Sequence, residues 1–165
     1  MTPLRKILVA TDFSEPSEAA LAYGRELART FGAKLTLLHI VDDVTAHTFA
    51  TDGAMLIDAE AQSVADAAAH RRLESSLSED DRRELQATTA LVMSMKPATA
   101  IVSYAQESGV DLIVMGTHGR GGVAHFLMGS VAEQVVRTAP APVLTIRCPG
   151  RDLLRPDALV AVAKA

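Results

Sequence analysis

At 165 residues, with 48% hydrophobic residues and a net charge of −4, the chain has the size and composition of one globular domain. This charge excludes a general attraction to nucleic acid or to an anionic membrane, and no apolar run is long enough to span a bilayer. The single cysteine, Cys148, excludes an internal disulfide and a multi-cysteine metal site. Because the first apolar run starts within a few residues of Met1, no signal peptide is expected, and the expected location is the cytoplasm.

The first part of the chain predicts a strand, a helix and a second strand. Residues 6–11 form an apolar run with β-branched residues, which indicates a central strand. The capping residue Ser14, with an acid and a proline after it, predicts a helix that stops at Gly32. Residues 34–41 form the second strand, in which His39 is predicted to be structural. The core-facing stripe of the helix is expected at Ala20, Leu21, Leu27, Ala28 and Phe31.

The middle of the chain predicts a loop followed by a long helix. Residues 43–53 are polar and small and indicate a loop or lid over a ligand site at the end of the second strand. An alanine-rich helical pattern runs from about residue 54 to 73 and extends as far as Arg83. The charged run at residues 79–83 is interpreted as a solvated face or a turn.

A third strand and a third helix are predicted next. Residues 90–95 form the strand, and its residues Leu91, Met93 and Met95 share one face. A methionine stripe of this kind is more typical of a core than of a cofactor site. Lys96 and Pro97 begin a helix that ends at Gly109.

The last third predicts a strand that leads into a glycine-rich loop. The strand covers residues 112–115 and ends at Gly116, and a helical pattern resumes only at residues 130–138, with Val131, Val135 and Val136 facing inward. Glycines allow close backbone approach, and amides at a helix N-terminus attract anions, so this loop is predicted to bind phosphate. Residues 143–146 form a fifth strand at the edge of the sheet.

Asp12 stands at the carboxyl end of the first strand. In open α/β sheets, ligands bind outside the carboxyl ends of the strands where the strand order reverses. A carboxylate there accepts hydrogen bonds from a ligand amino group or hydroxyl. The alternative is a local turn or a cap on the following helix.

Four separated stretches resemble the universal stress protein family. The spacing Gly116-x2-Gly119-x9-Gly129-Ser130 is similar to its nucleotide-binding signature, and the segments at residues 7–14, 39–42 and 142–146 resemble it in order and spacing. The resemblance implies an open, doubly wound α/β fold of flavodoxin-like or Rossmann-like type. It has five parallel strands in the order 3-2-1-4-5 and helices on both faces. Residues 1–147 are expected to form this domain and residues 148–165 a C-terminal extension.

The resemblance implies an adenine nucleotide as ligand, above all ATP with Mg²⁺, or else ADP or AMP. Asp12 and the backbone at Ile40 would face the adenosine, Gly116 and Gly119 the ribose and phosphates, and the start of the last helix the distal phosphates. Arg120 would assist the loop amides, and His118 either contacts the ligand or braces the loop. The full implied set is Ala10, Thr11, Asp12, Ile40, Met115, Gly116, His118, Gly119, Arg120, Gly129, Ser130 and Val131.

The function implied is that of a stress-response sensor or regulator rather than a dedicated enzyme, acting as a homodimer through the edge strand Val143–Ile146. One alternative is slow ATP hydrolysis or autophosphorylation on Ser130 or a loop threonine. Another is a member of the family that has lost nucleotide and works through protein contacts. This second alternative rests on two departures from the usual pattern, Met95 in place of a glycine and Ala132 in place of an asparagine. A flavin-binding electron carrier is a more distant possibility.

Overall fold

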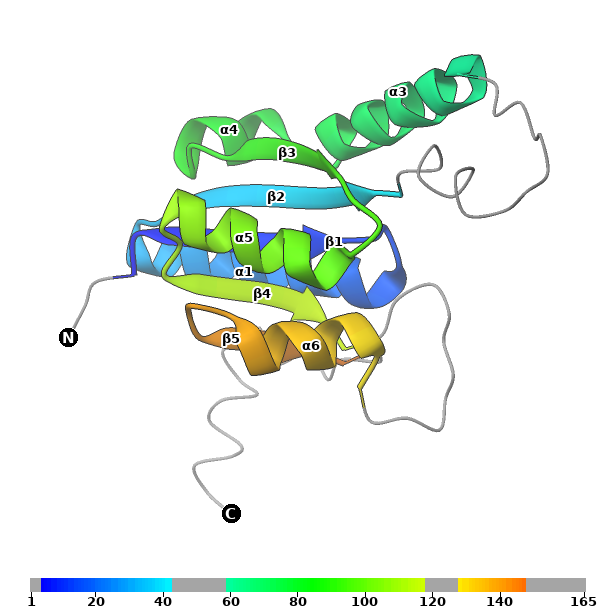
Figure 1. Ribbon diagram of the computed structural model, residues 1–165. Coiled ribbons are helices and arrows are strands. Elements are labelled where there is room, and N and C mark those ends of the chain that lie inside the picture. Colours follow the sequence, from blue (N-terminus) through cyan, green and yellow to red (C-terminus); the bar gives the residue numbers. More distant parts are fainter. Residues whose placement is uncertain (1–3, 43–58, 118–127, 148–165) are drawn as a thin grey trace.

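Five parallel strands form one sheet in the order β3-β2-β1-β4-β5 in the computed structural model, which describes residues 4–42, 59–117 and 128–147 (Figure 1). Helices cover both faces, so the expected fold class and strand order are confirmed. The strands are β1 (Lys6–Thr11), β2 (Lys34–Val41), β3 (Thr88–Met93), β4 (Leu112–Gly116) and β5 (Val143–Ile146). The helices are α1 (Glu15–Phe31), α3 (Ala59–Ser75), α4 (Glu79–Glu84), α5 (Pro97–Ser108) and α6 (Ser130–Thr138).

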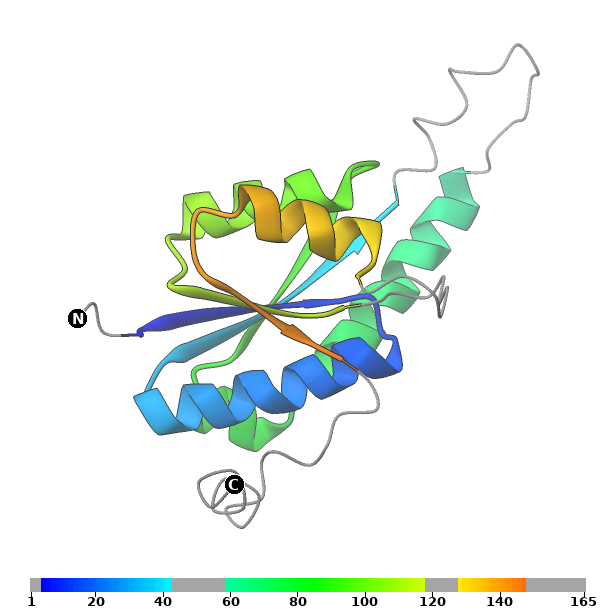
Figure 2. The same cartoon turned by 90° about the horizontal axis from the view of Figure 1, so that it is seen from below.

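The sheet separates two hydrophobic layers. Figure 2 shows α5 and α6 on one face and α1, α3 and α4 on the other. Alternate residues of β1 supply the two layers, because successive side chains of a strand point to opposite faces. Ile7 and Val9 pack in the layer of α1, whereas Leu8 and Ala10 pack in the layer of α5 and α6. The central strand is therefore buried on both faces, as the continuous apolar run predicted.

The helix ends predicted from glycine are confirmed. Gly32 follows α1 with a φ of 62°, and Gly109 follows α5 with a φ of 60°. Both lie in the left-handed region, where a residue without Cβ meets no steric penalty. The start of α1 differs in one detail, since the Ser14 hydroxyl does not cap the helix and instead donates to the Asp12 carboxylate.

The prediction of one helix through Arg83 is wrong, because the chain breaks after Ser75 and starts α4 at Glu79. Ser78 is the reason. Its hydroxyl accepts from the backbone N–H of Asp81, and the Asp81 carboxylate accepts from the backbone N–H of Ser78. This reciprocal capping box begins a new helix.

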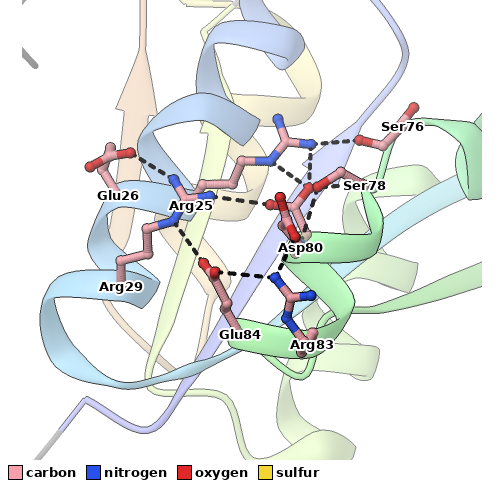
Figure 3. Close-up of polar contacts among 9 residues, drawn as sticks. Arg25, Glu26, Arg29, Ser76, Ser78, Asp80, Arg83 and Glu84 are labelled. Atoms are coloured by element: carbon pink, nitrogen blue, oxygen red, sulfur yellow. Dashed lines mark hydrogen bonds and ion pairs between the residues drawn. The ribbon is translucent and has the colours of Figure 1, made fainter.

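Within the charged run at residues 79–83, Glu79, Asp80 and Arg83 are exposed as expected of a solvated face, but the interpretation is wrong for Asp81, which is only 1% exposed. Its carboxylate accepts from Nε of Arg25 at 3.0 Å, and Nη2 of Arg29 lies 3.5 Å from its other oxygen. Figure 3 shows both arginines of α1 reaching toward α4. The guanidinium of Arg25 also donates to the carbonyl of Ser76 at 2.6 Å. The buried carboxylate of Asp81 is thus paired with the partly exposed guanidinium groups of Arg25 and Arg29, and this pairing fixes α4 against α1.

Several apolar side chains expected in the core are exposed: Phe31 at 57%, Met93 at 50%, Val136 at 45% and Met95 at 44%. The prediction of a strand at residues 90–95 is two residues too late, because β3 runs from Thr88 to Met93, and among the described strands it pairs with β2 alone. The methionine stripe is therefore not a core feature. The buried face of α1 ends at Ala28, one turn before Phe31, and α6 buries only Ala132 and Val135.

Candidate functional site

Several of the predicted site residues lie together at the carboxyl edge of the sheet. Thr11 pairs with His39 of β2, and Ala10 pairs with Met115 of β4. This register places Asp12, Ile40 and Gly116 at the same edge, each at or just beyond the end of its strand. The strand order reverses between β1 and β4, so these residues lie at the switch point where open α/β sheets bind ligands.

Asp12 takes part in a local turn, which was the alternative to a ligand role. Its Oδ1 accepts from the backbone N–H of Ser14 at 3.1 Å and from the Ser14 hydroxyl at 2.5 Å. These bonds fix the orientation of the carboxylate at the mouth of the β1–α1 connection. A turn of this kind holds the group in place and leaves a ligand role to be tested separately.

Thr11 also ties the connection together. Its hydroxyl lies 3.0 Å from the Ser17 hydroxyl and accepts from the backbone N–H of Phe13 at 3.0 Å. Ser17 in turn donates to the carbonyl of Ser14 at 2.8 Å. The side chain of Thr11 therefore organises the loop rather than pointing away from it.

Gly116 is required for packing as well as for any approach of a ligand. A Cβ at this position would lie 2.8 Å from Cβ of Pro16 and 2.9 Å from its carbonyl carbon. Side chains do not tolerate such contacts, so only glycine lets the end of β4 lie against the start of α1. The glycine thereby brings the β4 edge and the β1–α1 connection together.

The start of α6 lies directly beside this point. The backbone N–H of Gly129 donates to the carbonyl of Thr117 at 2.7 Å, and the N–H of Thr117 donates to Ile146 at 2.8 Å. Gly129 is the N-cap residue, and Ser130 is the first helical residue and is exposed. Within the described residues no side chain caps α6 through this position, so its first-turn amides keep the donor character of an open helix end.

The other predicted residues are placed as follows. Ala10 and Met115 are 8% and 5% exposed and belong to the core beneath α5 and α6, so only their backbone is available at the edge. Ile40 and Val131 are partly buried against the same core. His118, Gly119 and Arg120 lie outside the described residues. Of the two departures from the family pattern, Ala132 is buried in the core, whereas Met95 is exposed beyond β3.

Residues around Phe13 were missed by sequence reasoning. Phe13 has a φ of 63°, its ring lies 4.3 Å from the His39 ring, and the guanidinium of Arg72 lies 4.5 Å from the ring centroid. Nδ1 of His39 bonds the carbonyl of Thr11 at 2.7 Å, which agrees with the structural role predicted for this histidine. No sequence pattern predicts the contact with Arg72, because Arg72 and Phe13 are 59 positions apart and meet only in the folded chain.

Two further features concern possible partners. Within residues 4–42, 59–117 and 128–147, none of the helices combines the length and apolar character needed to cross a lipid bilayer. Over the same part of the chain, histidine, cysteine and acidic residues do not gather in threes as a dedicated metal site would require.

The fold and the edge geometry together define a class: a doubly wound α/β domain with an open helix N-terminus at its switch point. The sequence profile of the Universal stress protein family matches residues 3–147. The chain belongs to the universal stress protein family.

Individual relatives agree with this assignment. A Thermus aquaticus protein described as "Universal stress protein in QAH/OAS sulfhydrylase 3'region" is 34% identical over 149 residues, covering 87% of this chain and 98% of its own. The structure of the universal stress protein UspA from Lactobacillus plantarum is 31% identical, with a TM-score of 0.68, and the match covers 89% of this chain and all of that one. The universal stress protein from Archaeoglobus fulgidus in complex with dAMP is 24% identical, with a TM-score of 0.59, and covers 88% and 99% of the two chains. At this level of identity, the last likeness shows a shared fold alone.

Proposed function

We propose that this protein binds an adenine nucleotide, above all ATP, at the carboxyl edge of β1 and β4, and that binding makes it a sensor or regulator of the stress response. The observation that carries the proposal is the hydrogen bond between Gly129 and Thr117, because it seats the open end of α6 at the switch point of the sheet. Support comes also from the Archaeoglobus fulgidus neighbour, which holds dAMP.

The phosphates would bind at the start of α6. The backbone N–H groups of the first turn, from Ser130 onward, point out of the helix end together with the positive end of its dipole. The exposed Ser130 hydroxyl adds a donor. The predicted Gly119, His118 and Arg120 belong to the same proposal, as the loop that would complete the phosphate site.

The adenosine would bind toward β1 and β2. The Asp12 carboxylate is oriented by Ser14 at the mouth of the β1–α1 connection, where it can accept from an amino group or a hydroxyl. Ile40 stands next to Asp12 at the same height of the sheet, and its backbone would meet the base. Gly116 stands on the other side of Asp12, at the end of β4, where the absence of a side chain lets the β4 edge lie against the β1–α1 connection.

Mg²⁺ would be held by the phosphates of ATP rather than by a protein cage. Mg²⁺ keeps most of its waters and commonly binds through substrate phosphates, so the lack of a three-ligand cluster in the described parts of the chain fits this arrangement. Efficient phosphoryl transfer needs a positioned base and additional charge stabilisation. The proposed role is therefore binding, with slow hydrolysis or autophosphorylation as the alternative that the test distinguishes.

Calorimetry on nucleotide-stripped protein with ATP and Mg²⁺, beside AMP, tests the proposal, and released ADP is measured in the same samples. Tight ATP binding without turnover supports a nucleotide-dependent regulator. Absence of binding overturns the proposal in favour of a protein-contact role, and steady ADP release overturns the non-enzymatic part.

Two substitutions at the helix cap sharpen this test. Gly129 has a φ of −73°, which any residue adopts, so Gly129→Asp and Gly129→Asn should both fold and cap α6. The carboxylate would occupy the first-turn amides and repel phosphate, so Gly129→Asp should bind ATP at least about tenfold more weakly, without loss of stability. Gly129→Asn, which caps without charge, should lose less affinity. Equal binding by both variants and the parent would exclude α6 as the phosphate site.

We also propose that the protein forms a homodimer through the open edge of β5, with residues 1–147 as the family domain and residues 148–165 as an extension. β5 has β4 on one side, and its other edge carries backbone donors and acceptors suited to a second copy.

A further inference from the structure

Phe13 adopts a backbone conformation that a bulky residue rarely takes. Its φ of 63° is one of two positive values at non-glycine residues in the described part of the chain. Residues held in this region cluster at functional sites, and they persist only where the surrounding structure holds them. Phe13 stands between Asp12 and Ser14, the two residues whose hydrogen bonds orient the candidate adenine-binding carboxylate.

Contacts from three directions hold Phe13. Its N–H donates to the Thr11 hydroxyl at 3.0 Å, and its ring packs against His39 of β2 with the ring planes inclined at 42°. Arg72 of α3 makes two contacts: Nη2 donates to the Phe13 carbonyl at 3.1 Å, and the guanidinium lies over the ring. A cation over an aromatic face and a charged hydrogen bond both favour this arrangement.

Arg72 lies in the last turn of α3, and contacts of the neighbouring residues hold this end of the helix in place. The next residue, Leu73, is 1% exposed, and Glu74 accepts from Thr89 of β3 and, at 2.7 Å, from Nη2 of Arg82 of α4. The Thr89 hydrogen bond is also the main reason why the pKa of Glu74 lies below its ordinary value. In Figure 1 the first part of α3 extends past the sheet. The last turns of α3, which these contacts fix, therefore place Arg72 beside the β1–α1 connection.

We infer that Arg72 is a positioning residue for the adenine side of the nucleotide site, acting through Phe13 on the Asp12 carboxylate. This inference rests on the proposed nucleotide-binding function. Arg72 holds the Phe13 peptide from the side of α3 while His39 holds its ring from the side of β2. Without Arg72, Phe13 relaxes toward negative φ, the peptides on either side rotate, and the Ser14 donors no longer fix Asp12.

The consequence concerns base selection as well as affinity. A fixed carboxylate accepts from the amino group of adenine, whereas guanine presents a carbonyl oxygen at the corresponding ring position and is repelled. A loosened Asp12 should therefore weaken ATP binding more than GTP binding. A general loss of stability would leave the ratio of the two affinities unchanged.

The test compares Arg72→Ala, Arg72→Lys and the control Arg71→Ala by calorimetry with ATP and with GTP. Arg71 is the adjacent exposed arginine, for which the structure shows no ion pair or hydrogen bond with other described residues. Arg72→Ala should lose about three- to tenfold in ATP affinity with a smaller loss for GTP, and Arg72→Lys, which keeps a cation over the ring, should regain part of it. Arg71→Ala should match the parent.

Hydrogen exchange in the absence of nucleotide provides a second readout. The N–H groups of Phe13 and Ser14 are bonded to Thr11 and Asp12, so they should exchange faster in Arg72→Ala and at the parental rate in Arg71→Ala. Unchanged exchange, or an unchanged ratio of ATP to GTP affinity in a parent that binds ATP, overturns the inference alone. A parent that binds no adenine nucleotide overturns the proposed function and this inference with it.

Discussion

The carboxylate of Asp81 accepts a hydrogen bond from Nε of Arg25 at 3.0 Å, a contact that joins α4 to α1 across 56 positions of sequence. The Asp81 side chain is 2% exposed and that of Arg25 is 25% exposed. Ser78 completes the arrangement, because its backbone N–H donates to the same carboxylate oxygen. One acidic residue in a run of charges thus holds a helix start and a helix–helix contact together.

Asp81→Asn should lower the free energy of unfolding by about 3 kcal/mol. Removing one partner of a buried ion pair leaves the other poorly compensated, although the partly exposed guanidinium of Arg25 regains some hydration. Urea denaturation at neutral pH measures the change. Asp80→Asn is the matched control: the Asp80 side chain is 65% exposed and pairs with Arg83 on the same helix, so its effect should stay within about 0.5 kcal/mol. Equal effects of the two variants would refute the assigned role of Asp81.

Stability should decrease in acid through the same residue. Burial raises the pKa of Asp81, but hydrogen bonds with Ser78 and Arg25 lower it by more, so the folded-state pKa lies below the ordinary value of 3.8. A carboxyl whose pKa is depressed by folding stabilises the protein above its unfolded pKa, and that contribution is lost as the pH falls through the folded value. Denaturant midpoints measured from about pH 7 to about pH 3 should fall below about pH 4 in the parent, and less steeply in Asp81→Asn. A parallel decline in both proteins would mean that other groups govern acid unfolding.

Gly116→Ala should displace the start of α1 and destabilise the fold by about 1–3 kcal/mol. The added methyl group would meet Pro16 at 2.8–2.9 Å, and a backbone carbon cannot move aside as a flexible side chain does. Thermal unfolding measures the stability change, and calorimetry with ATP should show weaker binding, because Gly116 borders the candidate site. In Gly24→Ala the new methyl group meets the Val9 side chain at 2.5 Å in the core, so this control should change stability but leave ATP affinity at the parental value. Loss of binding in the control as well would indicate a general effect of destabilisation.

Thr145→Pro should convert the proposed homodimer into a monomer. The carbonyls of Pro142 and Ile146 accept from the backbone N–H groups of Ile113 and Thr117, on the β4 side, so by strand alternation the N–H of Thr145 faces the open edge of β5. Proline removes that donor without removing a bond to β4. Light scattering after size-exclusion chromatography measures the mass of the parent and the variant. Met93→Lys, at the opposite edge strand β3, is the control and should remain dimeric. If Met93→Lys is monomeric while Thr145→Pro remains dimeric, the interface lies at β3.

Local pattern was sufficient for β1, β2, β4 and β5, for the ends of α1 and α5 and for the switch-point edge, but it placed β3 two residues too late and missed the break after Ser75. The apolar run of β1, the glycines that end α1 and α5, and the strand before Gly116 depend on the period of the sequence and on backbone sterics, both of which act over a few residues. For this reason the fold class, the strand order implied by family resemblance and the edge position of Asp12, Ile40 and Gly116 were predictable.

Tertiary structure alone decided which charges and which apolar side chains are buried. Asp81 is buried where two arginines of α1 lie opposite it, and Met93 is exposed on β3, the edge strand of the described sheet. The same holds for Arg72, which meets Phe13 across 59 positions of sequence. Burial and ion pairing depend on residues that are distant in sequence and that folding brings together, whereas the periods of helices and strands can be recognised in consecutive residues.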